Sequence, residues 1–239
     1  MTPEQAAHDT RAAVALGGRF MIDGATYARG AELGFEGLDF YVAGRGGVLG
    51  DVSADVVSAA FVFWSPTTIA EAWDRSAPVA SRATAAAEFV ACAHAWGRAN
   101  FPEGAATARA AELLGPIVAG ASVATAPLFA GWRARPEPTD PRALLIHRIN
   151  ALRELRGALH AAAILTVGLA PVEAIAVGSP GMLAIYGHDG PVPDAEPLRD
   201  RWNLAEARTD RMTGRAYGAI GAEERAELVE VLAEVTTGL

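Results

Sequence analysis

Apolar and polar positions follow the 3.6-residue period of α-helices along most of the chain, most clearly over residues 144–170. On a helical projection, this stretch places leucines and alanines on one side and a mostly polar set on the other. We therefore predict one long central helix. Its apolar side holds Leu144, Leu145, Leu152, Leu155, Leu159, Ala162 and Ala163, and its polar side holds His147, Asn150, Arg153, Glu154, Gly157 and His160.

The polar side of this helix has two interpretations, and both stay open. It is either a solvated face on which Glu154 pairs with Arg153, or a buried site. The second interpretation draws on residues 161–172, which carry no charge and suggest that the helix enters a core. Gly157 would then open a notch for a ligand or a crossing helix, with Arg153 and His160 close together in a largely buried pocket.

The rest of the chain is punctuated by glycine and proline, which divide it into further predicted helices. Glycines at 44, 46, 47 and 50 predict a tight turn around Arg45, which either only joins two helices or presents the arginine to an anion. We expect helices over residues 3–16, 23–33, 38–43, 54–64, 67–73, 78–96, 104–114, 203–213 and 222–235, and a hairpin or a broken helix over 171–186. The fold class is all-α. The proline-rich stretch 133–141 predicts a linker between an N-terminal helical part (1–135) and a second part (141–239), unless the two form one compact domain.

The charged residues narrow the chemistry. All twenty basic residues are arginine, which excludes a lysine Schiff base and a phosphate-loop lysine. Arginine stays protonated, so these cations can bind anions but cannot act as bases. The net charge of −8 gives an acidic surface that repels phosphate backbones, and we therefore do not expect nucleic acid as a partner.

Other residue types predict neither a cofactor nor a metal site. The single cysteine, Cys92, excludes an internal disulfide, and the five histidines have no metal-ligand spacing. The N-terminus lacks the pattern of a signal peptide, and glycine and proline interrupt the uncharged stretch 113–132, so we expect a cytoplasmic protein without a membrane span. Small residues over 115–131 favour close helix packing and a homodimer, or a heterodimer with a related chain.

Three stretches resemble the EvbL-like family of actinobacterial helical proteins, over nearly the whole chain. They are DFYVAGRGGVLGDVSADVVSAAFVFWSP at 39–66, APLFAG at 126–131 and LRELRGALHAAAILTVGLAPVEA at 152–174. The positions that match the family pattern are Arg45, Arg153, Glu154, Arg156, Gly157 and His160. Leu155 stands where the family has histidine, and Ala158-Leu159 stands where it has aspartate-glycine.

The resemblance implies a small winged-helix-like C-terminal part, which is short and acidic in this chain. Some relatives lie in natural-product pathways. The chain is also similar to the paired proteins that form the aziridine ring of azinomycin-type compounds by displacing a sulfate ester. We therefore predict a cofactor-free enzyme, or enzyme subunit, that acts on an anionic small molecule by intramolecular displacement of a sulfate or phosphate. Its substrate-binding residues would be Arg45, Arg153, Arg156, Tyr41 and Trp64, and its catalytic residues would be His160, as proton carrier, and Glu154.

Two other classes stay open: a small-molecule-responsive helix-turn-helix regulator and a non-catalytic partner subunit. An enzyme should bring Arg45, Arg153 and His160 together at one cavity. A partner subunit should show a large apolar patch at a dimer interface. A regulator should show an exposed basic helix near 204–215, where Arg208, Arg211 and Arg215 recur at helical spacing.

Overall fold

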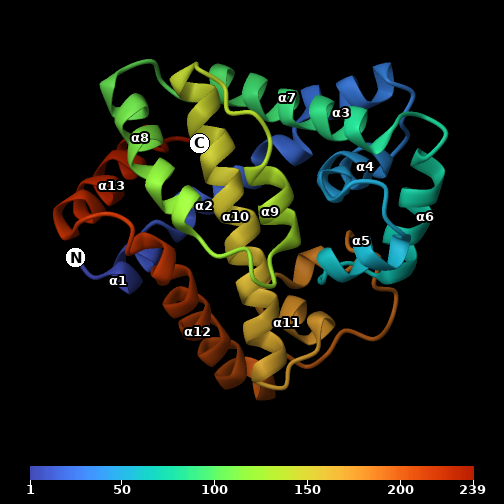
Figure 1. The fold of residues 1–239 in the computed structure, drawn as a ribbon. Helices are drawn as coiled ribbons and strands as arrows, with labels where there is room; N and C mark the ends of the chain where they lie inside the picture. The colour runs from blue at the N-terminus through green and yellow to red at the C-terminus, as the bar shows by residue number, and fades with distance from the viewer.

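The chain folds into α-helices without a β-strand, which confirms the all-α prediction (Figure 1). The computed structural model describes residues 1–239. The α-helices are α1 (Pro3–Asp9), α2 (Arg11–Ala15), α3 (Gly24–Glu32), α4 (Asp39–Gly46), α5 (Ala54–Ala60), α6 (Pro66–Ser76), α7 (Arg82–Asn100), α8 (Ala105–Gly120), α9 (Pro127–Arg133), α10 (Pro141–Thr166), α11 (Pro171–Gly178), α12 (Arg199–Tyr217) and α13 (Ala222–Val235). Four short 3₁₀ segments accompany them: η1 (Leu16–Ile22), η2 (Gly47–Leu49), η3 (Pro180–Met182) and η4 (Glu196–Leu198).

The longest helix, α10, runs through the middle of the molecule and is drawn in yellow in Figure 1. The Asp140 side chain caps it by accepting hydrogen bonds from the first backbone N–H groups, and Pro141 takes the first helical position. Helices α7, α8, α9 and α12 pack around it. The polar side of α10 therefore lies largely inside the fold, as the second interpretation held. Its buried members are His147, Asn150, Glu154 and His160.

One large apolar cluster forms the core and extends from Ala6 in α1 to Val235 in α13. At its centre, the ring of Phe20 lies 5.0 Å from that of Phe89 and 6.0 Å from that of Trp132, measured between centroids. Burial of this apolar surface drives the folding of the chain. Residues 1–135 and 141–239 both contribute to the cluster, and their separation into two parts stays a prediction.

Arg45 lies in the last turn of α4, so the predicted loop around it is wrong. The glycines beside it permit close packing. A Cβ atom on Gly44 would lie 2.5 Å from the Cβ of Phe89, and one on Gly47 would lie 2.5 Å from the carbonyl oxygen of Arg82. Because residues 44–46 are helical, their backbone N–H groups bond within α4 and are not free to hold an anion.

Several element boundaries also differ from the predictions. The helix expected over 3–16 is divided at Thr10 into α1 and α2, and the helix expected over 54–64 ends at Ala60. Residues 61–65 form a turn before α6 instead. The stretch 171–186 is a broken helix, α11 followed by η3.

The apolar stretch 113–132 forms the second half of α8, a turn and α9, and Pro116 lies within α8. No single helix is both long and apolar enough to cross a membrane. Only α10 and α11 taken together are long and apolar enough to span a membrane, and the two helices are bent by 109° where they join.

Candidate functional site

A cavity of about 300 Å³ lies against the middle of α10, between α2, α4 and the 61–65 turn. Aromatic and aliphatic side chains form much of its wall, among them Val14, Phe61, Phe63, Trp64, Leu128 and Tyr186. Its charged groups are Arg11, Arg45, Arg153, Glu154 and Arg156. All the residues predicted to bind a small molecule line this cavity, including Tyr41 and Trp64, although their role in binding stays a prediction.

The centre of the cavity wall is an ion pair between α4 and α10. Arg45 Nε donates to Glu154 Oε1 at 2.9 Å, and Arg45 Nη2 donates to Glu154 Oε2 at 2.8 Å. Arg153 Nη1 also donates to Oε1, at 2.9 Å. The remaining Nη1 group of Arg45 donates to the Tyr41 hydroxyl at 3.0 Å, and its guanidinium lies 4.3 Å from the ring centroid of Phe61. This bidentate geometry fixes the position of both helices at the cavity.

The groups of this cluster keep one another ionised. Burial alone would raise the pKa of Glu154, but the charges of Arg45 and Arg153, and their hydrogen bonds, hold it below its ordinary value. Burial alone would lower the pKa of Arg45, and the Glu154 carboxylate raises it above its ordinary value. Glu154 is therefore an ionised carboxylate that accepts three hydrogen bonds from arginine.

Two glycines make room at this site. A Cβ atom on Gly18, in η1, would lie 2.7 Å from Arg153 Nε. Any larger residue at this position would therefore displace the Arg153 side chain. A Cβ atom on Gly157 would meet nothing within 4 Å, and Gly157 lines the cavity. The notch predicted at Gly157 is thus open space and not the contact of a crossing helix.

His160 faces a different space, a groove formed by α1, α11 and α12 that Arg153 does not line. The predicted convergence of Arg153 and His160 on one pocket is therefore wrong. Thr209 Oγ1, which lies 3.0 Å from His160 Nδ1, donates its own hydrogen to the Ala205 carbonyl. The His160 imidazole is consequently the donor in the contact with Thr209.

Aromatic rings enclose the His160 side chain. Its centroid lies 5.8 Å from that of Phe63, which stacks on it, and 5.0 Å from that of Trp202, which meets it edge-on. Burial lowers the pKa of His160, although the Glu206 carboxylate opposes this effect. Burial of the side chain therefore favours the neutral imidazole.

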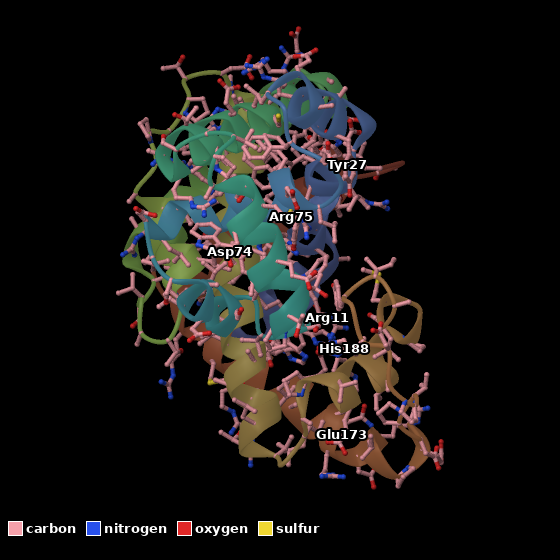
Figure 2. The ribbon with its side chains drawn as sticks, turned by 90° about the vertical axis from the view of Figure 1, so that its right-hand side faces the viewer. Arg11, Tyr27, Asp74, Arg75, Glu173 and His188 are labelled. Atoms are coloured by element: carbon pink, nitrogen blue, oxygen red, sulfur yellow. The ribbon has the colours of Figure 1, made fainter.

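One carboxylate of α12 connects the cavity with the groove. Glu206 Oε2 accepts hydrogen bonds from Arg11 Nη1 at 3.0 Å and from Arg156 Nη2 at 2.7 Å, and both arginines line the two spaces. Glu206 Oε1 lies 3.4 Å from His160 Nδ1. Figure 2 places Arg11 where the upper helices meet the α11 and α12 end of the molecule. Arg11 and Glu206 were not predicted as site residues, because 195 residues separate them in the chain. Only the spacing of four between Glu206 and Asp210 indicates a polar inner face of α12.

The outer face of α12 carries a row of arginines. Arg208, Arg211 and Arg215 recur at intervals of three and four residues, which places them on one face. The Arg211 side chain is 72% exposed, and Arg215 is exposed as well. The carboxylates of Glu206 and Asp210 lie on the opposite, inner face. An acidic chain thus presents the exposed basic helix that is expected of a nucleic-acid-binding regulator.

Helices α5 and α6 pack against each other and are joined by a short connection, so their surface is another candidate for DNA contact. Figure 2 looks onto α6, where Asp74 and Arg75 are labelled. Glu71 and Asp74 are exposed, and Arg75 Nη2 donates to Asp39 Oδ1 at 2.9 Å. This face is acidic with its one arginine paired, which disfavours contact with a phosphate backbone.

The all-helical architecture is compatible with the helix-turn-helix class of DNA-binding proteins. Comparison with family models places the chain in that class: residues 13–186 match a helix-turn-helix family, and the chain belongs to that family. The match ends before α12 begins, so it does not include the arginine row. No curated protein and no solved structure matches the chain.

Family membership overturns two predictions. The prediction of a ring-forming biosynthetic enzyme is wrong, because the family points to a DNA-binding regulator. Glu154 is bound by arginines, and His160 lies in the separate groove. The exclusion of nucleic acid is wrong too, because the matched family is a helix-turn-helix family, and the net charge of −8 does not describe how charge is distributed over the surface. The dimer stays a prediction.

Proposed function

We propose that this chain is a DNA-binding regulator that responds to a small molecule held in the cavity. Membership of the helix-turn-helix family is the observation that carries the DNA-binding part. The cavity supports the second part, because an apolar pocket with a few convergent polar groups is the usual form of a ligand site. The resemblance to EvbL-like proteins favours a ligand from a natural-product pathway.

In this proposal the DNA-contacting surface is the arginine row of α12, which follows the matched residues 13–186 and is chosen for its exposed positive charge. Residues 204–215 extend over roughly 16 Å at 1.5 Å per residue, a length suited to a helix laid into the major groove. Arginine donates to phosphates and, in bidentate fashion, to guanine. Arg208 is held in place by donating from Nη1 to Thr166 Oγ1 at 2.8 Å. Arg215 is exposed, and Arg211 is exposed with its Nε 3.8 Å from Glu4 Oε2.

The proposal is tested by selecting duplexes from a random-sequence DNA library with the full chain, then titrating a fluorescent duplex and following its anisotropy. We expect Arg211→Ala and Arg215→Ala each to weaken binding several-fold. Arg98→Ala is the matched control, because Arg98 is an exposed arginine on α7. Loss of binding in Arg75→Ala but not in the α12 variants would move the interface to α6. Failure to enrich any duplex would refute the proposed function.

A further inference from the structure

The cavity has an uneven charge distribution. Four of its lining residues are arginines and one, Glu154, is a carboxylate, in a chain whose net charge is −8. Its other walls are mainly apolar and aromatic. Charges in such a half-enclosed space are poorly screened, so the excess of arginine favours an anion over a neutral or cationic ligand.

Several donors at the cavity have no partner within the protein. Arg153 donates only to Glu154, which occupies one of its three nitrogens. The Nε atom of Arg156 is buried and has no hydrogen-bond acceptor. The Tyr41 hydroxyl accepts from Arg45 and keeps its own hydrogen for another acceptor. An anionic group in the cavity would supply the acceptors that these donors lack.

The two carboxylates beside the cavity differ in what they hold together. Glu154 joins α10 to α4, on the side away from α12. Glu206 joins Arg11 of α2 and Arg156 of α10 to α12 itself. An anion that draws Arg11 and Arg156 into the cavity therefore competes with Glu206 and weakens the attachment of α12.

Glu206 lies within one and a half helical turns of the first two arginines of the outer row. Arg208 and Arg211 follow it by two and five residues on the same helix, so a shift of α12 moves both surfaces together. Apolar contacts of Ala205 and Leu198 remain to hold the helix when the ion pairs are lost. The change expected is thus a loosening of α12 and not its unfolding.

We propose that the cavity binds a small organic anion, a carboxylate or a phosphate ester on an apolar body, and that this anion releases α12 by taking Arg11 and Arg156 from Glu206. The inference rests on the proposed function for its regulatory meaning, because release of α12 would lower DNA affinity. The ligand class and the release of α12 can each be measured without DNA.

The test uses the full chain with three probes: benzoate, phenyl phosphate and the neutral benzamide. Calorimetry measures binding, and hydrogen exchange followed by mass spectrometry measures protection of residues 199–217. We expect benzoate or phenyl phosphate to bind and to speed exchange in α12, and benzamide to do neither. Whichever anion binds more tightly shows whether the cavity prefers a carboxylate or a phosphate headgroup. Equal binding of benzamide, or no binding of either anion at millimolar concentration, would overturn the ligand class.

Glu206→Gln tests the competition. We expect faster exchange in α12 without a probe, about tenfold tighter anion binding because one nearby negative charge is removed, and no further change in exchange on binding. Glu230→Gln, an exposed carboxylate on α13, is the matched control. If Glu206→Gln does not fold, Arg156→Gln replaces it and should weaken anion binding.

Unchanged α12 exchange on anion binding would overturn the release of α12 but leave the DNA-binding proposal intact. Anion-dependent exchange in a protein that selects no duplex would refute the proposed function and support the cavity and its link to α12.

Discussion

Replacement of Glu154 by glutamine is the sharpest test of the buried cluster. The Glu154 side chain is 3% exposed and that of Arg45 is 13% exposed, with two hydrogen bonds of 2.9 and 2.8 Å between them. At an effective dielectric constant near 20, a pair of unit charges about 4 Å apart is worth roughly 4 kcal/mol. Removing one partner of a buried pair costs about 3–5 kcal/mol, because the remaining charge is left without compensation.

We therefore expect Glu154→Gln to lower the free energy of unfolding by about 3–4 kcal/mol at pH 7. Urea denaturation followed by tryptophan fluorescence and circular dichroism measures this change. The double variant Arg45→Met with Glu154→Gln should recover part of the loss, since it removes the unpaired cation. Glu230→Gln, exposed on α13, should stay within about 0.5 kcal/mol of the parent.

The pH dependence gives the same experiment a second readout. The pKa of Glu154 is lowered in the folded state, so its stabilisation is complete above the unfolded value, about 4.3, and is lost as the pH falls through the lower folded value. Glu154→Gln should lack this component. A loss below about 1 kcal/mol at pH 7, or no recovery in the double variant, would refute the view that Arg45 and Glu154 hold α4 against α10.

Three further predictions follow from individual residues. Gly44→Ala should destabilise the fold by about 1–3 kcal/mol, because the new Cβ would lie 2.5 Å from the Cβ of Phe89. Gly157→Ala should stabilise the fold by up to about 1 kcal/mol, because its Cβ would meet nothing within 4 Å and alanine favours the helix. The urea midpoints of the two variants measure both effects. The ring nitrogens of His94 and His147 lie 3.1 Å apart, and burial lowers the pKa of each histidine to about 4. The stability of the protein should therefore fall as the pH drops from about 6.5 towards 4. The urea midpoint should fall less over this pH range in His94→Phe than in the parent. The pKa of His160 is also lowered by burial, and an NMR titration should find its midpoint below about 6.5.

Local pattern was enough to predict the helical fold. The Asp140-Pro141 cap and the long apolar period predict α10, and the uncharged run after His160 points to its burial. The glycines near Arg45 led to the wrong prediction of a turn. A helix also tolerates glycine where a neighbouring helix packs closely, and no local sequence signal distinguishes that packing from a turn. The neighbour here is Phe89, on α7.

Apart from Trp64 in the 61–65 turn, the candidate site was predicted only in its α4 and α10 components. The partner of Arg45 is Glu154, 109 residues away, and the sequence carries no record of such a pairing. Arg11 was missed for the same reason, since its partner Glu206 lies in α12. The arginine row of α12 was visible in the sequence, but the net charge was given more weight. In the structure the acidic residues Glu206 and Asp210 of the same helix are turned inward against arginine and histidine.

The salt dependence of DNA binding tests the central claim most directly. For the selected duplex, the plot of log K against log salt concentration has a negative slope, which becomes shallower by about 0.9 for each phosphate contact that is lost. If α12 is the DNA-contacting helix, the variant with Arg208, Arg211 and Arg215 replaced by alanine should have a slope shallower by about 2–3 than the parent, while Arg98→Ala keeps the parental slope. An unchanged slope in the triple variant would contradict the account.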